Sequence, residues 1–124
     1  MHLPSEVEAI AVIPALRAML ARELLDKGGL RQVEVSSLLG ITQPAVSNYV
    51  TGVRARRLTL LDEPYIRERL SDIALSAVVM RDRAEIARGL AELTQYIRKN
   101  RMMCGMHRVI DPEVEVDTCR ICES

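Results

Sequence analysis

The chain has 124 residues, 48% of them apolar and 27% charged, which suits one compact domain or a small domain with an appendage. It contains no Phe or Trp, so the core is expected to consist of Leu, Ile, Val, Ala and Met, which favours packed helices over an aromatic-rich β-sandwich. Three cysteines are a poor basis for a disulfide framework, no secretory signal is visible, and no stretch approaches the roughly 20 apolar residues that span a bilayer. We therefore expect a cytoplasmic protein that does not enter a membrane.

The formal net charge of zero hides an uneven distribution of charge along the chain. No acidic residue stands between Gln43 and Leu61, and residues 81–108 carry seven Lys or Arg against three acids. The last sixteen residues hold five acids and a single arginine. This pattern indicates a basic body followed by an acidic tail.

Helical signals begin near Ser5, which has the spacing of a capping box with Glu8. Pro14 suits the first turn of the next helix, where its missing N–H costs no hydrogen bond. Four leucines then recur at helical spacing, namely Leu16, Leu20, Leu24 and Leu25. Gly28 and Gly29 are expected to end this helix.

Two short helices are predicted next. The first spans residues 31–40 and is closed by Gly40. The second begins at Thr42 as its N-cap and stops at Gly52. A basic connector, residues 53–57, follows the second helix.

Two longer helices are predicted in the second half, one beginning near residues 62–64 and one spanning residues 82–100. The second of them carries an apolar stripe at spacings of four, three and four, made of Ile86, Leu90, Leu93 and Ile97. Such a stripe favours a homodimer seam. Packing of the same stripe against helices of its own chain stays open as an alternative.

The two short helices and the glycine turn between them have the layout of a helix-turn-helix, whose second helix enters the DNA major groove. On a helical wheel one arc of the second helix is apolar and consists of Ala45, Val46, Tyr49 and Val50. The opposite arc is uncharged and rich in the amides and hydroxyls that read base edges, and it consists of Gln43, Pro44, Ser47, Asn48 and Thr51. The cationic side chains that follow it, expected to meet phosphates, are Arg54, Arg56 and Arg57.

The stretch "LRQVEVSSLLGITQPAVSNYVTG" resembles the phage-repressor-type (Cro/C1-like) helix-turn-helix. The matching residues are Gln32, Ser36, Gly40, Val46, Ser47 and Gly52. Together with a terminal "CRIC", residues 12–57 are similar to a group of small predicted archaeal transcriptional regulators. From Leu58 to Arg101 the likeness extends only to helical character.

The resemblance implies that Gln43, Ser47 and Asn48 meet bases and that Gln32 meets an adjacent phosphate. The predicted DNA-binding set also includes Thr42 at the start of the second helix. Arg31 departs from the pattern, because that family usually has a Ser or Thr N-cap at this position. The first helix of the motif is therefore expected to be capped poorly or differently, and Arg31 is a further candidate for a phosphate contact.

These elements predict an all-α protein built around a five-helix, phage-repressor-like helix-turn-helix. The expected division is a DNA-binding domain at residues 1–57, a helical dimerisation region at 58–101 and a metal-binding tail at 102–124.

The tail carries a C-x2-H pair, Cys104 and His107, and a C-x2-C pair, Cys119 and Cys122, separated by eleven residues. Two close pairs bridged by a loop of this length are typical of a tetrahedral metal site. Three thiolates and one imidazole suit structural zinc, which we favour, and an iron–sulfur cluster with one histidine ligand is the alternative. A reversible disulfide and thiols without a special role also stay open.

The sequence therefore predicts a sequence-specific DNA-binding transcriptional regulator, acting as a homodimer on double-stranded DNA and carrying a metal in its tail. The alternative is a non-regulatory interaction module that uses a zinc knuckle on a helical scaffold. No phosphate loop, Ser-His-Asp order or convincing carboxylate pair points to an enzyme, and no small-molecule substrate is predicted.

Overall fold

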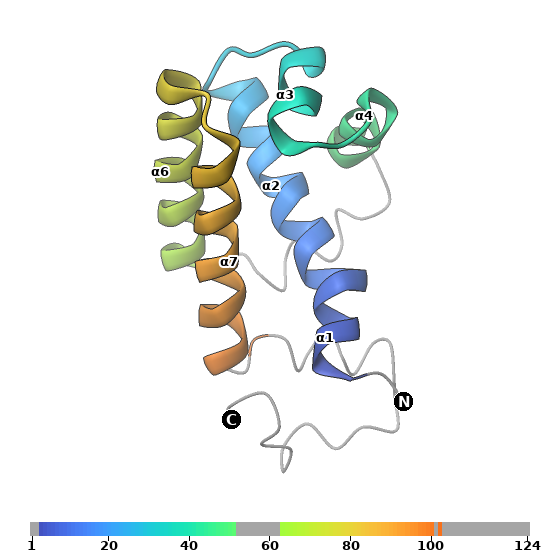
Figure 1. Ribbon diagram of the computed structural model, residues 1–124, viewed down its shortest axis with the longest axis vertical. Helices are drawn as coiled ribbons and strands as arrows, with labels where there is room; N and C mark the ends of the chain where they lie inside the picture. The colour runs from blue at the N-terminus through green and yellow to red at the C-terminus, as the bar shows by residue number, and fades with distance from the viewer. Residues whose placement is uncertain (1–2, 52–62, 101, 103–124) are drawn as a thin grey trace.

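The computed structural model describes residues 3–51, 63–100 and 102, and within these ranges the regular structure is entirely helical (Figure 1). The predicted all-α class is confirmed for this part of the chain. None of the helices described is both long enough and apolar enough to cross a lipid bilayer.

The first three elements run into one another as a single rod: α1 (Pro4–Val7), a π-helical turn η1 (Glu8–Val12) and α2 (Ile13–Asp26). Pro14 has no N–H and would crowd the carbonyl one turn earlier in a regular helix. Just before it the Ile13 N–H donates to the Glu8 carbonyl, five residues back, which gives the wider turn of a π-helix. The rod therefore passes the proline without a break.

The start of the rod differs from the predicted Ser5–Glu8 capping box. The helix begins at Pro4, and the Leu3 N–H donates to Oε1 of Glu6 at 3.0 Å. The prediction of Ser5 as the capping residue is wrong, because the chain enters the helix at Leu3 and the carboxylate three residues later, Glu6, caps that backbone N–H.

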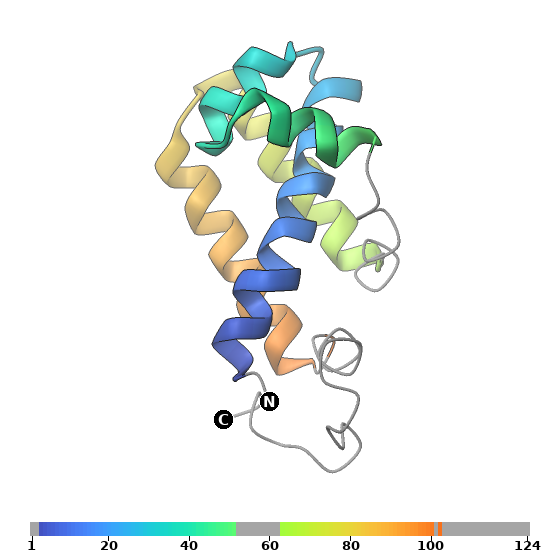
Figure 2. The same ribbon diagram turned by 90° about the vertical axis from the view of Figure 1, so that its right-hand side faces the viewer.

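The end of α2 and the next two helices follow the predicted order. Gly29 adopts a left-handed conformation with φ +67°, and the Leu30 N–H donates to the Leu24 carbonyl at 3.2 Å, which closes the helix end. Helices α3 (Gln32–Leu39) and α4 (Gln43–Thr51) then cross at one end of the rod (Figures 1 and 2).

Helices α6 (Pro64–Met80) and α7 (Arg83–Lys99) form an antiparallel hairpin beside α2. Each is capped by the acid before it: Glu63 accepts from the Ile66 N–H at 3.3 Å and Asp82 accepts from the Ala84 N–H at 3.0 Å. The turn between the helices is made by Arg81, whose φ of +53° is left-handed, an uncommon conformation for a residue with a side chain.

One hydrophobic core joins all these helices. The apolar stripe of α7 belongs to it, since Ile86, Leu93 and Ile97 are at most 4% exposed and Leu90 is partly buried. The stripe was expected either to form a homodimer seam or to pack within its own chain, and the structure shows packing within its own chain. The predicted homodimer stays a prediction, and it needs a contact other than this stripe.

Gly89 marks the closest approach of α7 to α6. A Cβ added there would lie 2.8 Å from both Cδ1 and Cγ1 of Ile73, which is itself buried. We expect Gly89→Ala to destabilise the protein by about 1–3 kcal/mol through overpacking, although alanine is the better helix former by about 1 kcal/mol. Urea unfolding measures the change, and a variant more stable than the parent would contradict this close approach.

Candidate nucleic-acid interface

The turn between α3 and α4 is built by local signals in the sequence. Gly40 ends α3 in the left-handed conformation with φ +67°, and the Ile41 N–H donates to the Ser36 carbonyl at 3.1 Å. Thr42 then caps α4, because its Oγ1 accepts from the Ala45 N–H at 3.2 Å. The predicted glycine stop and threonine cap are both confirmed.

The inner faces of the two helices pack on each other and on α2. Val35 of α3 and Val46 of α4 are fully buried, and Leu30, Leu38 and Tyr49 are each 8% exposed. Leu39 and Ile41 are only partly buried against the same core. Burying these apolar side chains fixes the angle between the two helices and decides which side of α4 faces outward.

The outer face of α4 carries the polar residues that the sequence assigns to DNA. Gln43, Pro44 and Asn48 are exposed, and so is Thr42 at the cap. Ser47 is half-buried. Figure 2 looks onto the side of the molecule where α4 lies, and the helix crosses the upper part of that view. Of the predicted arcs, Val46 and Tyr49 therefore face the core and Gln43, Pro44 and Asn48 face the solvent, whereas the side chain of Val50 lies outside the described residues.

Gln32 lies in the first turn of α3 and is also exposed. The side chain of Thr51 and the whole of Arg54, Arg56 and Arg57 lie outside the described residues. The same holds for all four predicted metal ligands, Cys104, His107, Cys119 and Cys122. In the described ranges themselves, no group of three or more His, Cys, Asp or Glu side chains is placed to hold a metal ion.

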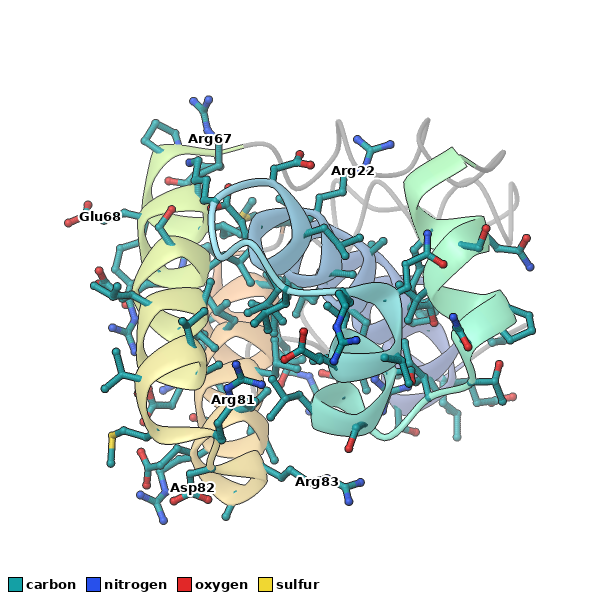
Figure 3. The ribbon with its side chains drawn as sticks, turned by 90° about the horizontal axis from the view of Figure 1, so that it is seen from above. Arg22, Arg67, Glu68, Arg81, Asp82 and Arg83 are labelled. Atoms are coloured by element: carbon teal, nitrogen blue, oxygen red, sulfur yellow. The ribbon has the colours of Figure 1, made fainter. Side chains whose placement is uncertain are left out.

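A carboxylate on α3, Glu34, joins the interface to the rest of the fold. Its Oε1 accepts from the Arg31 N–H at 3.0 Å and from Arg31 Nε at 3.2 Å. Its Oε2 accepts from Nη1 of Arg81 at 3.0 Å, and Arg81 lies in the turn between α6 and α7 (Figure 3). Glu34 therefore caps the start of α3 in place of the missing Ser or Thr and ties α3 to the α6–α7 turn.

These contacts hold the Glu34 carboxylate in its charged form. The backbone N–H of Arg31, followed by the guanidinium groups of Arg81 and Arg31, lowers the pKa of Glu34 from 4.5 to about 2. Arg31 is thus already paired with an acid, yet its side chain is 79% exposed and still faces solvent. Its predicted contact with a phosphate stays a prediction.

Sequence reasoning missed both partners in this link. The three-residue spacing of Arg31 and Glu34 is that of a capping box and was a usable signal for Glu34. Nothing in the sequence pointed to Arg81, because its place depends on how the α6–α7 turn packs beside α3.

Comparisons of this chain with protein-family models, with curated proteins and with solved structures found no match.

The Glu34 carboxylate makes the free energy of unfolding depend on pH. Because its pKa is lower in the folded state, its contacts stabilise the protein above the unfolded value near 4.5, and that stabilisation is lost as the pH falls toward 2. We expect Glu34→Gln to lower the melting temperature at neutral pH, and the difference from the parent to shrink as the pH falls below 4.5.

The matched control is Glu68→Gln on α6. Glu68 points away from the chain in Figure 3 and has no hydrogen bond or ion pair with any of the residues described. Its substitution should leave the melting curve unchanged at every pH. A constant difference between Glu34→Gln and the parent from neutral pH down to the acid limit would contradict the lowered pKa.

Proposed function

We propose that this protein is a sequence-specific DNA-binding transcriptional regulator that acts as a homodimer on double-stranded DNA. The observation that carries the proposal is the outer face of α4, where Gln43 and Asn48 are exposed over an apolar face that packs on α2 and α3. A helix held in this way, with uncharged amides outward, has the properties of a major-groove reading helix.

The side chains around this face suit contact with a polyanion. No acidic residue occurs in α4, and the acid of α3, Glu34, is bound by two arginines. Its negative charge is thereby offset close to the place where phosphates would lie. Gln32, exposed in the first turn of α3, is available to a phosphate, and the sequence supplies Arg54, Arg56 and Arg57 directly after α4.

A homodimer would present two copies of α4 to two half-sites about 34–36 Å apart, one turn of the double helix. The apolar stripe of α7 is occupied within its own chain, so the dimer contact must use other surfaces. Exposed apolar side chains are found on α6, where Leu75, Val79 and Met80 are each more than 60% exposed.

The metal in the tail is proposed from the chemistry of its donors alone. Three thiolates and one imidazole complete a closed tetrahedral shell for zinc, which would staple the loop between the two ligand pairs. A zinc site with four protein ligands leaves no open position for a reacting water, so the proposed role is structural or sensory and not catalytic.

The test of DNA binding is selection of sequences from a pool of random DNA duplexes with the immobilised full-length protein. We expect enriched sequences with two related half-sites one helical turn apart. Asn48→Ala should then weaken binding to the selected duplex by about 1–3 kcal/mol and relax the preference at one base position. Fluorescence anisotropy with the selected and scrambled duplexes measures both effects.

Gln95→Ala is the matched control, since Gln95 is another exposed amide, on α7. It should bind the selected duplex as the parent does. If Asn48→Ala keeps the parent's base preference, α4 does not read bases through this side chain. If no enrichment and no salt-dependent binding occur, the proposed function is wrong.

The metal is tested by elemental analysis of protein purified without added metal and without oxygen. We expect one zinc per chain, lost in Cys119→Ser together with Cys122→Ser and retained in Ser124→Ala. A brown, iron-containing preparation would show that the site holds an iron–sulfur cluster and not zinc. A protein with neither metal would contradict the metal site itself.

A further inference from the structure

A groove of about 560 Å³ lies between α2, the end of α3 and one face of α7. Its floor is formed by the buried side chains of Leu16, Leu38 and Ile86. Partly buried side chains, among them Leu39 and Leu90, form its walls. The interior is thus apolar and is walled by three helices.

On the α7 side, small residues leave the groove open to solvent. Ala84, Ala87 and Ala91 line it and are all exposed, so at these three positions no long side chain covers the opening. The lining of α7 extends from Arg83 to Thr94, which is roughly 16 Å at 1.5 Å per residue. The volume falls within the range of about 300–1,000 Å³ typical of small-ligand pockets.

The charge of the groove has one sign. Two arginines line it, Arg17 from α2 and Arg83 from the start of α7, and no acid does so among the described residues. Within the described part of the chain neither arginine has a hydrogen bond or an ion pair. Two cations therefore lie beside an apolar interior, and none of the residues that the structure describes gives them an anionic partner.

The acids of α7 lie on its other side. Asp82, Glu85 and Glu92 line a separate, smaller groove of about 260 Å³ that α7 forms with α6. In Figure 3 Arg83 extends toward α3, whereas Asp82 lies on the side of α6. The side of α7 that faces α6 thus carries charges of both signs, since Arg88 lies there with Glu85 and Glu92, whereas the side that faces α2 and α3 carries only Arg83 among its described charged residues.

We propose that this groove binds a small organic anion with an apolar body, such as a medium-chain carboxylate. The apolar part would cover Leu16, Leu38 and Leu90, where burial of hydrocarbon is favourable. The anionic group would be bound by Arg17 and Arg83, whose hydrogen bonds to a carboxylate are charge-assisted.

The groove is placed to influence the proposed DNA-binding face, and this consequence rests on the proposed function. Leu38 and Leu39 are the last two residues of α3, and Gly40 begins the turn to α4. The Nη2 of Arg83 lies 2.7 Å from where a Cβ on Gly40 would be. An anion that draws Arg83 into the groove acts at that turn, and by linkage DNA and anion would change each other's affinity by the same factor.

The binding site is tested without DNA by titrating the isotope-labelled, full-length protein with decanoate and following its amide signals by NMR. We expect saturable shifts at Leu38, Leu39, Ala87 and Leu90. Decyltrimethylammonium, a cation with the same apolar chain, should bind about tenfold or more weakly, because it meets two arginines.

Four variants locate the ligand. Ala87→Phe fills the groove and should abolish the decanoate shifts, whereas Gln95→Phe, exposed on the same helix outside the groove, should leave them unchanged. Arg83→Gln should weaken decanoate binding about tenfold. Arg88→Gln, which lies on the α6 side of α7, should not.

Three results would overturn the proposal: no saturable shift with decanoate, equal binding of the cation, or equal behaviour of Ala87→Phe and Gln95→Phe. Dissociation of a dimer by Ala87→Phe in sedimentation, without any decanoate shift, would assign the groove to a second copy of the chain instead. If decanoate binds as expected but no DNA sequence is selected, the anion site stands and the proposed function fails.

Discussion

The fold depends on the burial of α2 on nearly all sides. Leu16, Leu20 and Leu24 follow one another at intervals of four residues and are fully buried, and each contributes roughly 1.5–3 kcal/mol relative to exposure in water. Ala15, Ala18 and Ala21 on the same helix are also buried, and their small size lets α3, α4, α6 and α7 all reach it. Such a helix is apolar on more than one face, so it has no stable place outside the bundle. The same packing decides which face of α4 is exposed, because the contacts of α4 with α2 and α3 fix its orientation.

In addition to the apolar core, a set of polar contacts around Glu34 connects α3 to the α6–α7 turn. Glu34 joins three backbone or side-chain donors from two distant parts of the chain, and its partner Arg81 adopts a left-handed conformation in the turn between α6 and α7. The apolar core sets where α3 lies, and the charged link sets how α3 meets the hairpin of α6 and α7. Because the side chains of Glu34 and Arg81 are only partly shielded from water, their ion pair contributes little to the free energy of unfolding. Its main effect is to fix the orientation of α3 relative to the α6–α7 turn.

Much of the fold and the inner and outer faces of the candidate site could be predicted from the sequence, because their causes are local. Gly40 and Thr42 each determine their own turn of backbone, and the arcs of α4 follow from helical periodicity alone. The stripe of α7 shows the limit of such reasoning, since periodicity reports that a face is buried but not which surface covers it. The π-helical turn before Pro14, the position of Arg81 and the groove beside α7 were beyond prediction, because each depends on segments that meet only in the folded chain.

The path of α7 has a consequence for communication along the molecule. Its first residue, Arg83, lies beside Gly40 in the turn between α3 and α4, and its last turn is held to the rod of α1, η1 and α2 by an ion pair of 2.7 Å between Arg98 and Glu8. Met102, just beyond α7, donates its N–H to the Ile97 carbonyl at 3.0 Å and packs against the core, and this end of α7 lies opposite to α3 and α4 (Figure 1). The seventeen residues of α7 cover about 25 Å. A shift or tilt of α7 at its C-terminal end would therefore be transmitted along one stiff helix to the turn between α3 and α4.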